Sequence, residues 1–255
     1  MFLLSGVVVS ACGKEEDMAV QAQNHKLKKI EYLDEVYHTP KSYYRTWQTD
    51  FAFNDKGELT KVDEYNVETN TFSVNWGYGN AIVDEGRIAQ IHYHSWSADL
   101  KYNSNGNLKE IECDRTRYIA TWEGQNISKI SRVKKDGQIV EWTEYSYTNY
   151  QAGMLSYYVF FNPFCEFDFL DTTGESAVFF TGLCGPLSRN LPKEVRRWSK
   201  YGQDGKGLED VNAVLTMTYS YQMNSLGLPA HVTIEGKDFF DSAEKKIDMD
   251  ITWEE

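Results

Sequence analysis

Two carboxylates beyond the middle of the chain have the spacing of a glycoside hydrolase acid pair. Glu166 and Asp168 alternate with Cys165, Phe167 and Phe169. On a β-strand this alternation directs both carboxylates to one face, roughly 7 Å apart. That separation falls within the range of glycosidase acid pairs. Acidic residues are common on the hydrated face of an acidic protein, however, so we expect Glu166 and Asp168 to be solvated and the protein not to be an enzyme.

Two histidines form a second candidate site. His92 and His94 lie two positions apart, on one face of an expected strand, with Tyr93 on the other face. Two imidazoles bind a transition metal when a further carboxylate or thiolate completes the ligand set. The sequence provides no evident third ligand and no nucleophile-elbow, zinc-protease or phosphate-loop motif. We therefore expect no metal, no cofactor and no catalytic residue.

Aromatic side chains are the remaining candidates for binding. Trp76, Tyr78, Tyr93 and Trp96 lie close to Asn and Asp residues. Flat rings beside such polar groups suit the stacking of sugars, provided that the rings face outward. The alternative is that these four rings fill the interior of a wide sheet.

A turn motif recurs along the chain and predicts the elements that would position these residues. In Tyr102-Asn-Ser-Asn-Gly-Asn-Leu-Lys-Glu-Ile111, Asn103 opens a turn, Gly106 takes the left-handed conformation, and Leu108 begins the returning strand. Variants occupy residues 53–62, 84–91, 122–130 and 224–232. Their irregular spacing excludes a solenoid of fixed period. We predict one antiparallel meander whose corners share a turn chemistry.

The later strands predict the fold class. Apolar or aromatic residues alternate with polar ones throughout Leu215–Met223 and again throughout Ile247–Trp253. A period of two indicates a sheet with one apolar and one hydrated face, which argues against a parallel α/β fold. We therefore predict an all-β fold, a large antiparallel meander curled into a barrel or half-barrel.

Individual elements follow from the same pattern. We expect strands at residues 27–37, 43–53, 58–67, 72–78, 88–96, 98–102, 108–113, 118–122, 127–134, 138–147, 215–223 and 247–253. Charged residues place the first of these at an edge of the sheet. A short helix is expected near residues 175–184, where it would plug one end of the sheet or, alternatively, form a lid over a site.

The N-terminal segment predicts the location of the protein. Residues 1–11 form an apolar run that is too short to remain as a membrane-spanning helix and that fits a signal peptide. Val9-Ser10-Ala11-Cys12 resembles the lipobox of bacterial lipoproteins, in which the cysteine becomes the acylated N-terminus. The acidic Gly13–Asp17 resembles the export signal of surface lipoproteins of Bacteroidota. We expect residues 12–25 to be an acidic tether and residues 26–255 a single β domain, lipid-anchored in the outer membrane and exposed at the cell surface.

The sequence also contains candidate sites for O-glycosylation and for a disulfide bond. The segments around Thr172 and Ser242 resemble the O-glycosylation sites of exported proteins of Bacteroidota. Apart from Cys12, three cysteines remain, which is a poor framework for disulfides. A bond between Cys165 and Cys184 is the one pairing that the sequence leaves open.

Charge limits the partners. The chain has 255 residues and a net charge of -12, which argues against nucleic acid as a partner. The same charge disfavours contact of the domain itself with an anionic membrane surface, so we expect attachment through lipid alone.

The corner motif, the short helix before Ser188-Arg189-Asn190-Leu191-Pro192 and the later Gly227-Leu228-Pro229 resemble an uncharacterised family of Bacteroidota lipoprotein domains described as having a porin-like fold. The resemblance covers residues 26–255 and implies a broad curled antiparallel sheet without a known activity. Our leading hypothesis is a non-enzymatic envelope protein that binds a glycan or a protein or has a structural role. An integral outer-membrane barrel and a glycoside-active enzyme are the alternatives.

Overall fold

The computed structural model describes the chain from the first strand almost to the C-terminus, with gaps. The described residues are 26–38, 41–53, 55, 59–67, 71–75, 81–92, 97–113, 116–157, 161, 184–185, 187–199, 215–237 and 244–254. The signal, the acidic tether and the expected helix up to residue 183 therefore lie outside them. No helix among the described residues is long and apolar enough to span a membrane.

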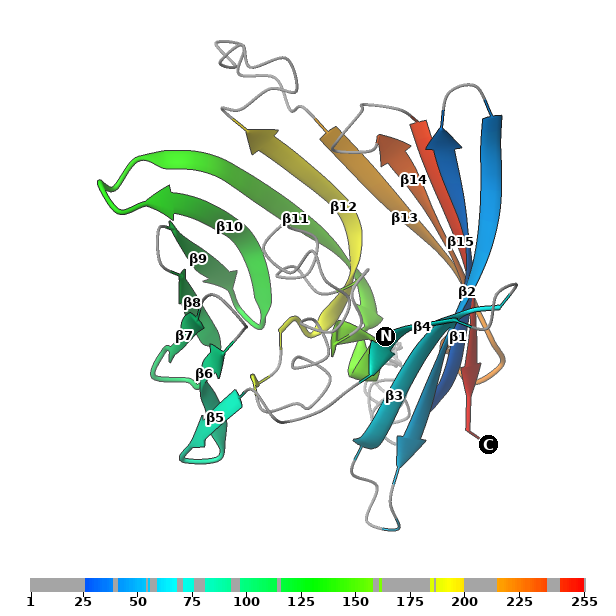
Figure 1. Ribbon diagram of the computed structural model, residues 1–255, viewed down its shortest axis with the longest axis horizontal. Coiled ribbons are helices and arrows are strands. Elements are labelled where there is room, and N and C mark those ends of the chain that lie inside the picture. The colour runs from blue at the N-terminus through cyan, green and yellow to red at the C-terminus, as the bar shows by residue number, and fades with distance from the viewer. Residues whose placement is uncertain are drawn as a thin grey trace, which may run out of the picture.

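All described strands belong to one antiparallel sheet of 15 strands, so the predicted all-β fold is confirmed (Figure 1). The strands are β1 (Leu27–His38), β2 (Lys41–Phe53), β3 (Leu59–Asn66), β4 (Thr71–Asn75), β5 (Ala81–Asp84), β6 (Arg87–His92), β7 (Ser97–Tyr102), β8 (Leu108–Cys113), β9 (Thr116–Glu123), β10 (Asn126–Lys134), β11 (Ile139–Gln151), β12 (Asn190–Ser199), β13 (Leu215–Met223), β14 (Pro229–Lys237) and β15 (Glu244–Trp253). The sequence pattern missed β5, β12 and β14, and it also missed a 3₁₀ turn at Gly153–Tyr157.

The first and the last described strands meet in the interior of this sheet. β1 pairs with β2 on one side and with β15 on the other, so that Tyr32 lies opposite both Trp47 and Met249. The prediction of an edge position for the first strand is therefore wrong. Lys29 and Glu31 of this strand alternate with the buried Ile30 and Tyr32 and pair with each other at 2.6 Å on the hydrated face.

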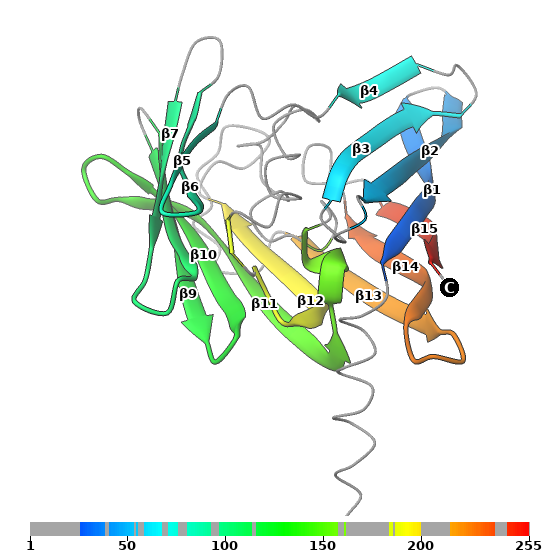
Figure 2. The ribbon, with the colours of Figure 1, turned by 90° about the horizontal axis from the view of Figure 1, so that it is seen from below.

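The edges of the sheet are β4 and β5, which follow each other in the chain. Figure 2 shows these two strands on opposite arms of a curled sheet. Each has one ladder partner within the described residues, β3 for β4 and β6 for β5. The sheet is thus curled but not closed, which corresponds to the half-barrel of the prediction.

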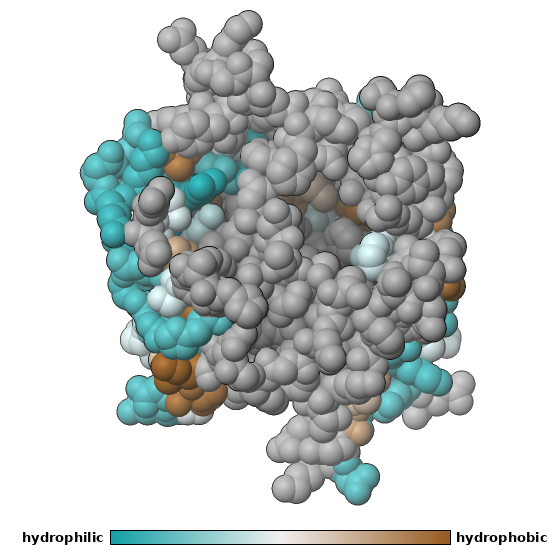
Figure 3. Space-filling view, viewed as in Figure 1, coloured by the Kyte–Doolittle hydropathy of each residue, from teal (hydrophilic) through white to brown (hydrophobic). Residues whose placement is uncertain are grey.

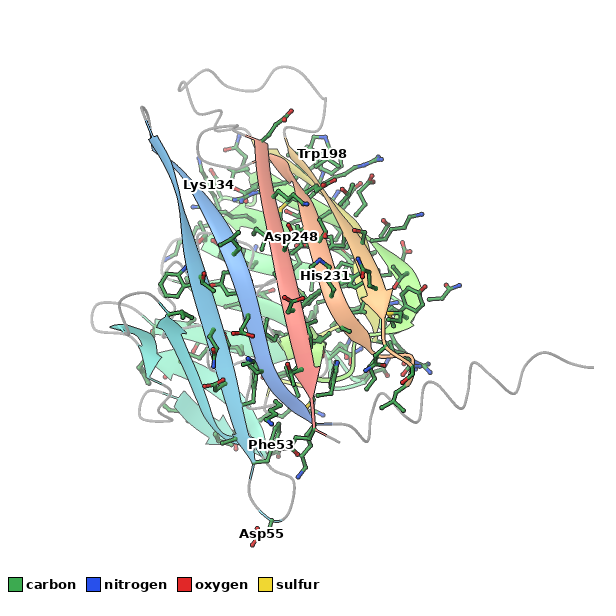
Figure 4. The ribbon with its side chains drawn as sticks, turned by 90° about the vertical axis from the view of Figure 1, so that its right-hand side faces the viewer. Phe53, Asp55, Lys134, Trp198, His231 and Asp248 are labelled. Carbon is green, nitrogen blue, oxygen red and sulfur yellow. The ribbon has the colours of Figure 1, made fainter. Side chains whose placement is uncertain are left out.

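The two faces of the sheet differ in the manner that the alternation predicts. On β15, Ile247 and Met249 are buried, whereas Asp248 and Asp250 between them are not. Figure 4 views β15 and β14 from outside the curl, with Asp248 and His231 labelled on the exposed surface. The concave face therefore carries the apolar core, and the convex face carries the polar side chains.

Ion pairs cover the convex face. They include Lys101 with Glu112 (2.5 Å), Lys129 with Glu144 (3.3 Å), Arg196 with Glu194 (2.7 Å) and Lys246 with Asp248 (3.1 Å). Each exposed pair contributes at most about 1 kcal/mol to stability, so their main effect is to keep this face hydrated. Figure 3 shows hydrophilic residues along the margin at β10 and β11, and a smaller hydrophobic patch over β5, where Ile82 and Val83 are exposed.

The recurring corners have a common geometry. In the corners at residues 103–107 and 224–228, the side-chain oxygen of the first residue, Asn103 or Asn224, accepts hydrogen bonds from the backbone amides two and four positions later, at 2.9 to 3.0 Å. Gly106 and Gly227 take φ angles of 81° and 76°, and each amide donates to the carbonyl of the corner's Asn. A residue with a Cβ would be strained at such an angle. The predicted turn chemistry is confirmed at these two corners.

Candidate functional site

Most residues singled out by the sequence fall outside the described part of the chain. This holds for Cys12, Trp76, Tyr78, Tyr93, Trp96, Glu166, Asp168, Thr172 and Ser242. His92 is described and is exposed at the end of β6, whereas His94 is not described. Within the described residues, no three His, Cys, Asp or Glu side chains are grouped so that they could hold a metal ion.

The described structure brings together two tryptophans that the sequence analysis did not select. Trp142 on β11 lies directly opposite Trp198 on β12. Their rings stack with centroids 5.5 Å apart and an interplanar angle of 13°. Both side chains remain partly exposed, while the next residue of β11, Thr143, and its partner Arg197 are buried on the other face. The indole pair therefore belongs to the convex face.

Charged side chains form a second row beside the tryptophans. Lys129 on β10 lies opposite Glu144 on β11, which in turn lies opposite Arg196 on β12. The Lys129 ammonium is 3.3 Å from the Glu144 carboxylate and 5.1 Å from the ring centroid of Trp142. The row that contains the two tryptophans continues on β10, where Ser131 lies opposite Trp142. We call these six residues, Lys129, Ser131, Trp142, Glu144, Arg196 and Trp198, the tryptophan face.

A buried ion-pair cluster lies on the opposite side of the same three strands. Glu141, only 2% exposed, pairs with the buried Arg197 and lies 3.7 Å from Arg132. Removing water from charges is costly, and such a cluster persists only where opposite charges compensate each other. The cluster joins β10, β11 and β12, so it fixes the strands that carry the tryptophan face. We therefore interpret it as a positioning element.

A histidine and three polar residues connect β14 and β15 elsewhere on the convex face. His231 Nδ1 is 2.8 Å from Asp250, and Thr233 donates a hydrogen bond of 2.7 Å to Asp248. Partial burial opposes the ionisation of Asp248, but the bonds from Thr233 and Lys246 and the nearby charges of Lys246 and His231 outweigh it and lower its pKa. Because the Thr233 hydroxyl donates to Asp248 and is 3.4 Å from His231 Nε2, it is not directed as an activated nucleophile would be.

Cys184 is a free thiol in a turn, so the bond to Cys165 that the sequence left open is not formed there. Its burial raises the pKa of the thiol to about 12. A thiol of this kind is almost entirely protonated at neutral pH and is a poor nucleophile. Cys165 itself lies outside the described residues.

Five tight turns lie at one end of the sheet, and the tryptophan pair lies toward the other end. Lys26 accepts a backbone hydrogen bond of 2.8 Å from Glu254, and its ammonium lies 5.5 Å from the ring of Phe53. Since neighbouring strands are antiparallel, the turns after β2, β5, β7, β9 and β13 all lie at this end. Trp142 follows the start of β11 and Trp198 precedes the end of β12, so both lie toward the other end. Figure 4 shows Trp198 and Lys134 at the end opposite Phe53 and Asp55.

The sequence contained part of the signal for this site. Trp142 alternates in phase with Glu144 and Ser146, and Trp198 is in phase with Arg196 and Glu194. A large aromatic on the polar phase of a strand predicts an outward ring. The pairing of β11 with β12, which are separated by 38 residues, could not be read from local pattern.

Comparison with known proteins gives weak likenesses. No family model and no curated protein matches the chain. A porin-like protein from Bacteroides uniformis aligns at a TM-score of 0.46 and 12% identity, covering 89% of this chain and 96% of its own. A porin-like protein from Bacteroides vulgatus aligns at 0.47 and 9% identity, covering 90% and 99%. A LolA superfamily protein from Nitrosomonas europaea aligns at 0.26 and 10% identity, covering 93% and 91%. At these TM-scores the likenesses carry no inference about function.

Proposed function

We propose that the protein is a non-enzymatic envelope module, tethered by lipid at Cys12 and displayed at the cell surface, that binds a glycan through the tryptophan face. The observation that carries this proposal is the Trp142 and Trp198 pair on the convex face of β11 and β12. Sugars pack their C–H faces against indole rings, and their hydroxyls bond to charged side chains close by. Lys129, Glu144 and Arg196 supply such donors and acceptors in the adjacent row.

The hydrated convex face supports a domain that lies in water. A transmembrane barrel presents an apolar band to lipid, and a Lys or Arg at the bilayer midplane costs about 2–4 kcal/mol there. The convex face carries Lys101, Lys129, Arg196 and Lys246 in ion pairs along several strands. This distribution favours the tethered module over the integral outer-membrane barrel.

The orientation of the sheet also supports the proposal. Lys26 is the first described residue after the expected tether and lies at the end that carries the tight corners. A module tethered there would direct its other end, with the tryptophan face, away from the membrane. A glycan outside the cell would then reach the indole pair without passing the tether.

The proposal is tested with the full chain carrying Cys12→Ala, which cannot be acylated and can be assayed without detergent. Affinity electrophoresis through a panel of neutral and acidic polysaccharides measures retardation of this chain and of a variant with Trp142→Ala and Trp198→Ala. We expect retardation by at least one polysaccharide and its loss in the alanine variant. A variant with Trp142→Phe and Trp198→Phe keeps flat rings at both positions and should retain most of the binding.

Leu226→Ala is the matched control, since Leu226 is an exposed apolar residue at the opposite end of the sheet. Retardation that is unchanged in the tryptophan-to-alanine variant would refute the assignment of the site. Absence of retardation across the whole panel would refute the glycan-binding function. Turnover of a retarding polysaccharide that is lost in Glu166→Gln with Asp168→Asn would support the glycoside-active alternative instead.

A further inference from the structure

The strands that carry the tryptophan face differ in charge from the rest of the protein. β10, β11, β12 and the turn between the first two contain seven basic and four acidic side chains, although the whole chain has a net charge of -12. The basic residues are Lys129, Arg132, Lys134, Lys135, Lys193, Arg196 and Arg197, and the acidic residues are Asp136, Glu141, Glu144 and Glu194. The tryptophan face thus lies on a basic segment of an acidic protein.

Burial leaves this excess of basic side chains unchanged at the surface, because it removes one charge of each sign. Glu141 is on the concave face, 2% exposed, and its charge is compensated there by Arg197. Arg196 is more than half exposed on the convex face, and Lys135 is exposed in the turn after β10. A ligand approaching the indole pair from solvent therefore meets more cationic than anionic side chains of this segment.

The screening length in solution determines whether an anionic ligand at the indole pair is influenced more by the charges of this segment or by the net negative charge of the whole chain. At physiological ionic strength the Debye length is about 8 Å, so charges farther away are largely screened. The acidic cluster around Asp248 and Asp250 lies on β15, three strands beyond β12. At roughly 4.8 Å per strand, that cluster is more than a Debye length from Trp198. Within that distance, Glu144 and Glu194 pair with Lys129 and Arg196 at 3.3 and 2.7 Å. The excess of positive charge around the indole pair therefore comes from the remaining basic side chains, Lys134, Lys135 and Lys193, which outnumber Asp136.

The spacing of the two rows matches a single kind of sugar. Residues two apart on a strand are separated by roughly 7 Å, which is the offset between Trp142 and Glu144 and between Trp198 and Arg196. A sugar ring with an anionic substituent presents an apolar face and a charge over a similar length. One such ring could stack on an indole while its anionic group contacts the guanidinium of Arg196 or the ammonium of Lys129.

We infer that the ligand of the tryptophan face is an anionic polysaccharide, whose sugar faces pack on Trp142 and Trp198 and whose acidic groups bind Lys129 and Arg196. This inference rests on the proposed glycan-binding function and specifies the ligand class. Carboxylate and sulfate groups share the required chemistry, because both accept charge-assisted hydrogen bonds from Lys and Arg.

The test compares matched polymers on the full chain carrying Cys12→Ala. The probes are polygalacturonate, the same polymer after reduction of its carboxyl groups, dextran sulfate and unmodified dextran. We expect the chain to bind at least one anionic polymer about tenfold more tightly than its neutral counterpart, with the preference falling as salt is raised. The carboxylate and sulfate arms identify which anionic group is preferred.

Two double variants test whether Lys129 and Arg196 cause the preference for anionic polymers. Lys129→Ala with Arg196→Ala should abolish the difference between anionic and neutral polymers, and Lys129→Arg with Arg196→Lys should keep it. Lys101→Ala with Lys246→Ala is the control, since both lysines are in ion pairs elsewhere on the convex face. Thermal unfolding confirms that each variant is folded.

The possible outcomes distinguish failure of this inference from failure of the proposed glycan-binding function. Equal binding of anionic and neutral polymers that depends on the tryptophans would overturn this inference and leave the glycan-binding function in place. An anionic preference that survives Lys129→Ala with Arg196→Ala would also overturn it. Binding of no polymer would overturn both this inference and, if extended over the wider panel, the proposed function.

Discussion

Trp142 and Trp198 face each other across β11 and β12 on the convex side, while their neighbours Thr143 and Arg197 face each other on the concave side. A slip of one residue in either strand would exchange the faces of that strand and bury a tryptophan. The buried pair of Arg197 and Glu141 opposes such a slip. A slip of one strand would move one of these two charges to the convex face and leave the other buried without its partner. The site on the outside thus depends on an ion pair on the inside.

Replacing Glu141 by Gln should destabilise the protein strongly. Loss of the carboxylate leaves Arg197 buried next to a neutral group, and breaking a buried pair in this way costs about 3–5 kcal/mol. Glu144→Gln on the same strand is the matched control, since Glu144 is exposed and its pair with Lys129 contributes at most about 1 kcal/mol. Urea unfolding measures both. Similar free energies of unfolding for the two variants would contradict the positioning role of the cluster.

Replacing Asn103 by Ala should weaken one corner. The Asn103 side chain accepts two backbone hydrogen bonds, and its removal leaves those amides to water or unpaired, at a cost of about 1–2 kcal/mol. Asn105→Ala changes the same residue type at an exposed position of the same corner and should cost less. Equal losses in chemical denaturation would show that the shared turn chemistry is not what stabilises these corners.

Asp248 should make stability depend on pH in the acid range. Its pKa is below the ordinary value of 3.8, so the unfolded chain binds a proton there before the folded protein does. The contribution of Asp248 is therefore complete above about pH 4 and is lost as the pH falls through its folded pKa. In Asp248→Asn, the fall in the free energy of unfolding between about pH 5 and pH 3 should be smaller than in the unmodified chain. An identical fall would contradict the lowered pKa.

Cys184 should be unreactive in the folded protein. Its thiol has a pKa of about 12 and is buried, so little thiolate is available near neutral pH. Site-resolved mass spectrometry after treatment with iodoacetamide should find Cys184 unmodified in buffer and modified in denaturant. Cys113 is partly exposed and provides the internal comparison. Rapid alkylation of native Cys184 would show that the turn opens readily.

Alternation and turn residues were sufficient to predict the fold class and most strands. Leu215–Met223 was predicted to the residue, because its polar and apolar positions alternate without exception. β14 was missed because Pro229 stands where the first apolar residue of a strand was expected. The four-residue β5 is too short for a periodic signal.

Long-range pairing was less accessible to sequence reasoning. The charges of β1 indicated an edge, but β15 returns from the far end of the chain to pair with it, and no local pattern records that partner. The tryptophan face was missed for the same reason, because Trp142 and Trp198 become neighbours only through the register of β11 and β12. Neither Trp76 nor Trp96, the sequence candidates, lies in the described part of the chain.

The most direct test is therefore a comparison of two double variants in polysaccharide binding. One carries Trp142→Ala and Trp198→Ala, and the other carries Trp76→Ala and Trp96→Ala. We predict that the first loses affinity by about tenfold or more, while the second binds like the unmodified chain. Loss in the second variant with binding intact in the first would contradict the assignment of the site to the convex face of β11 and β12.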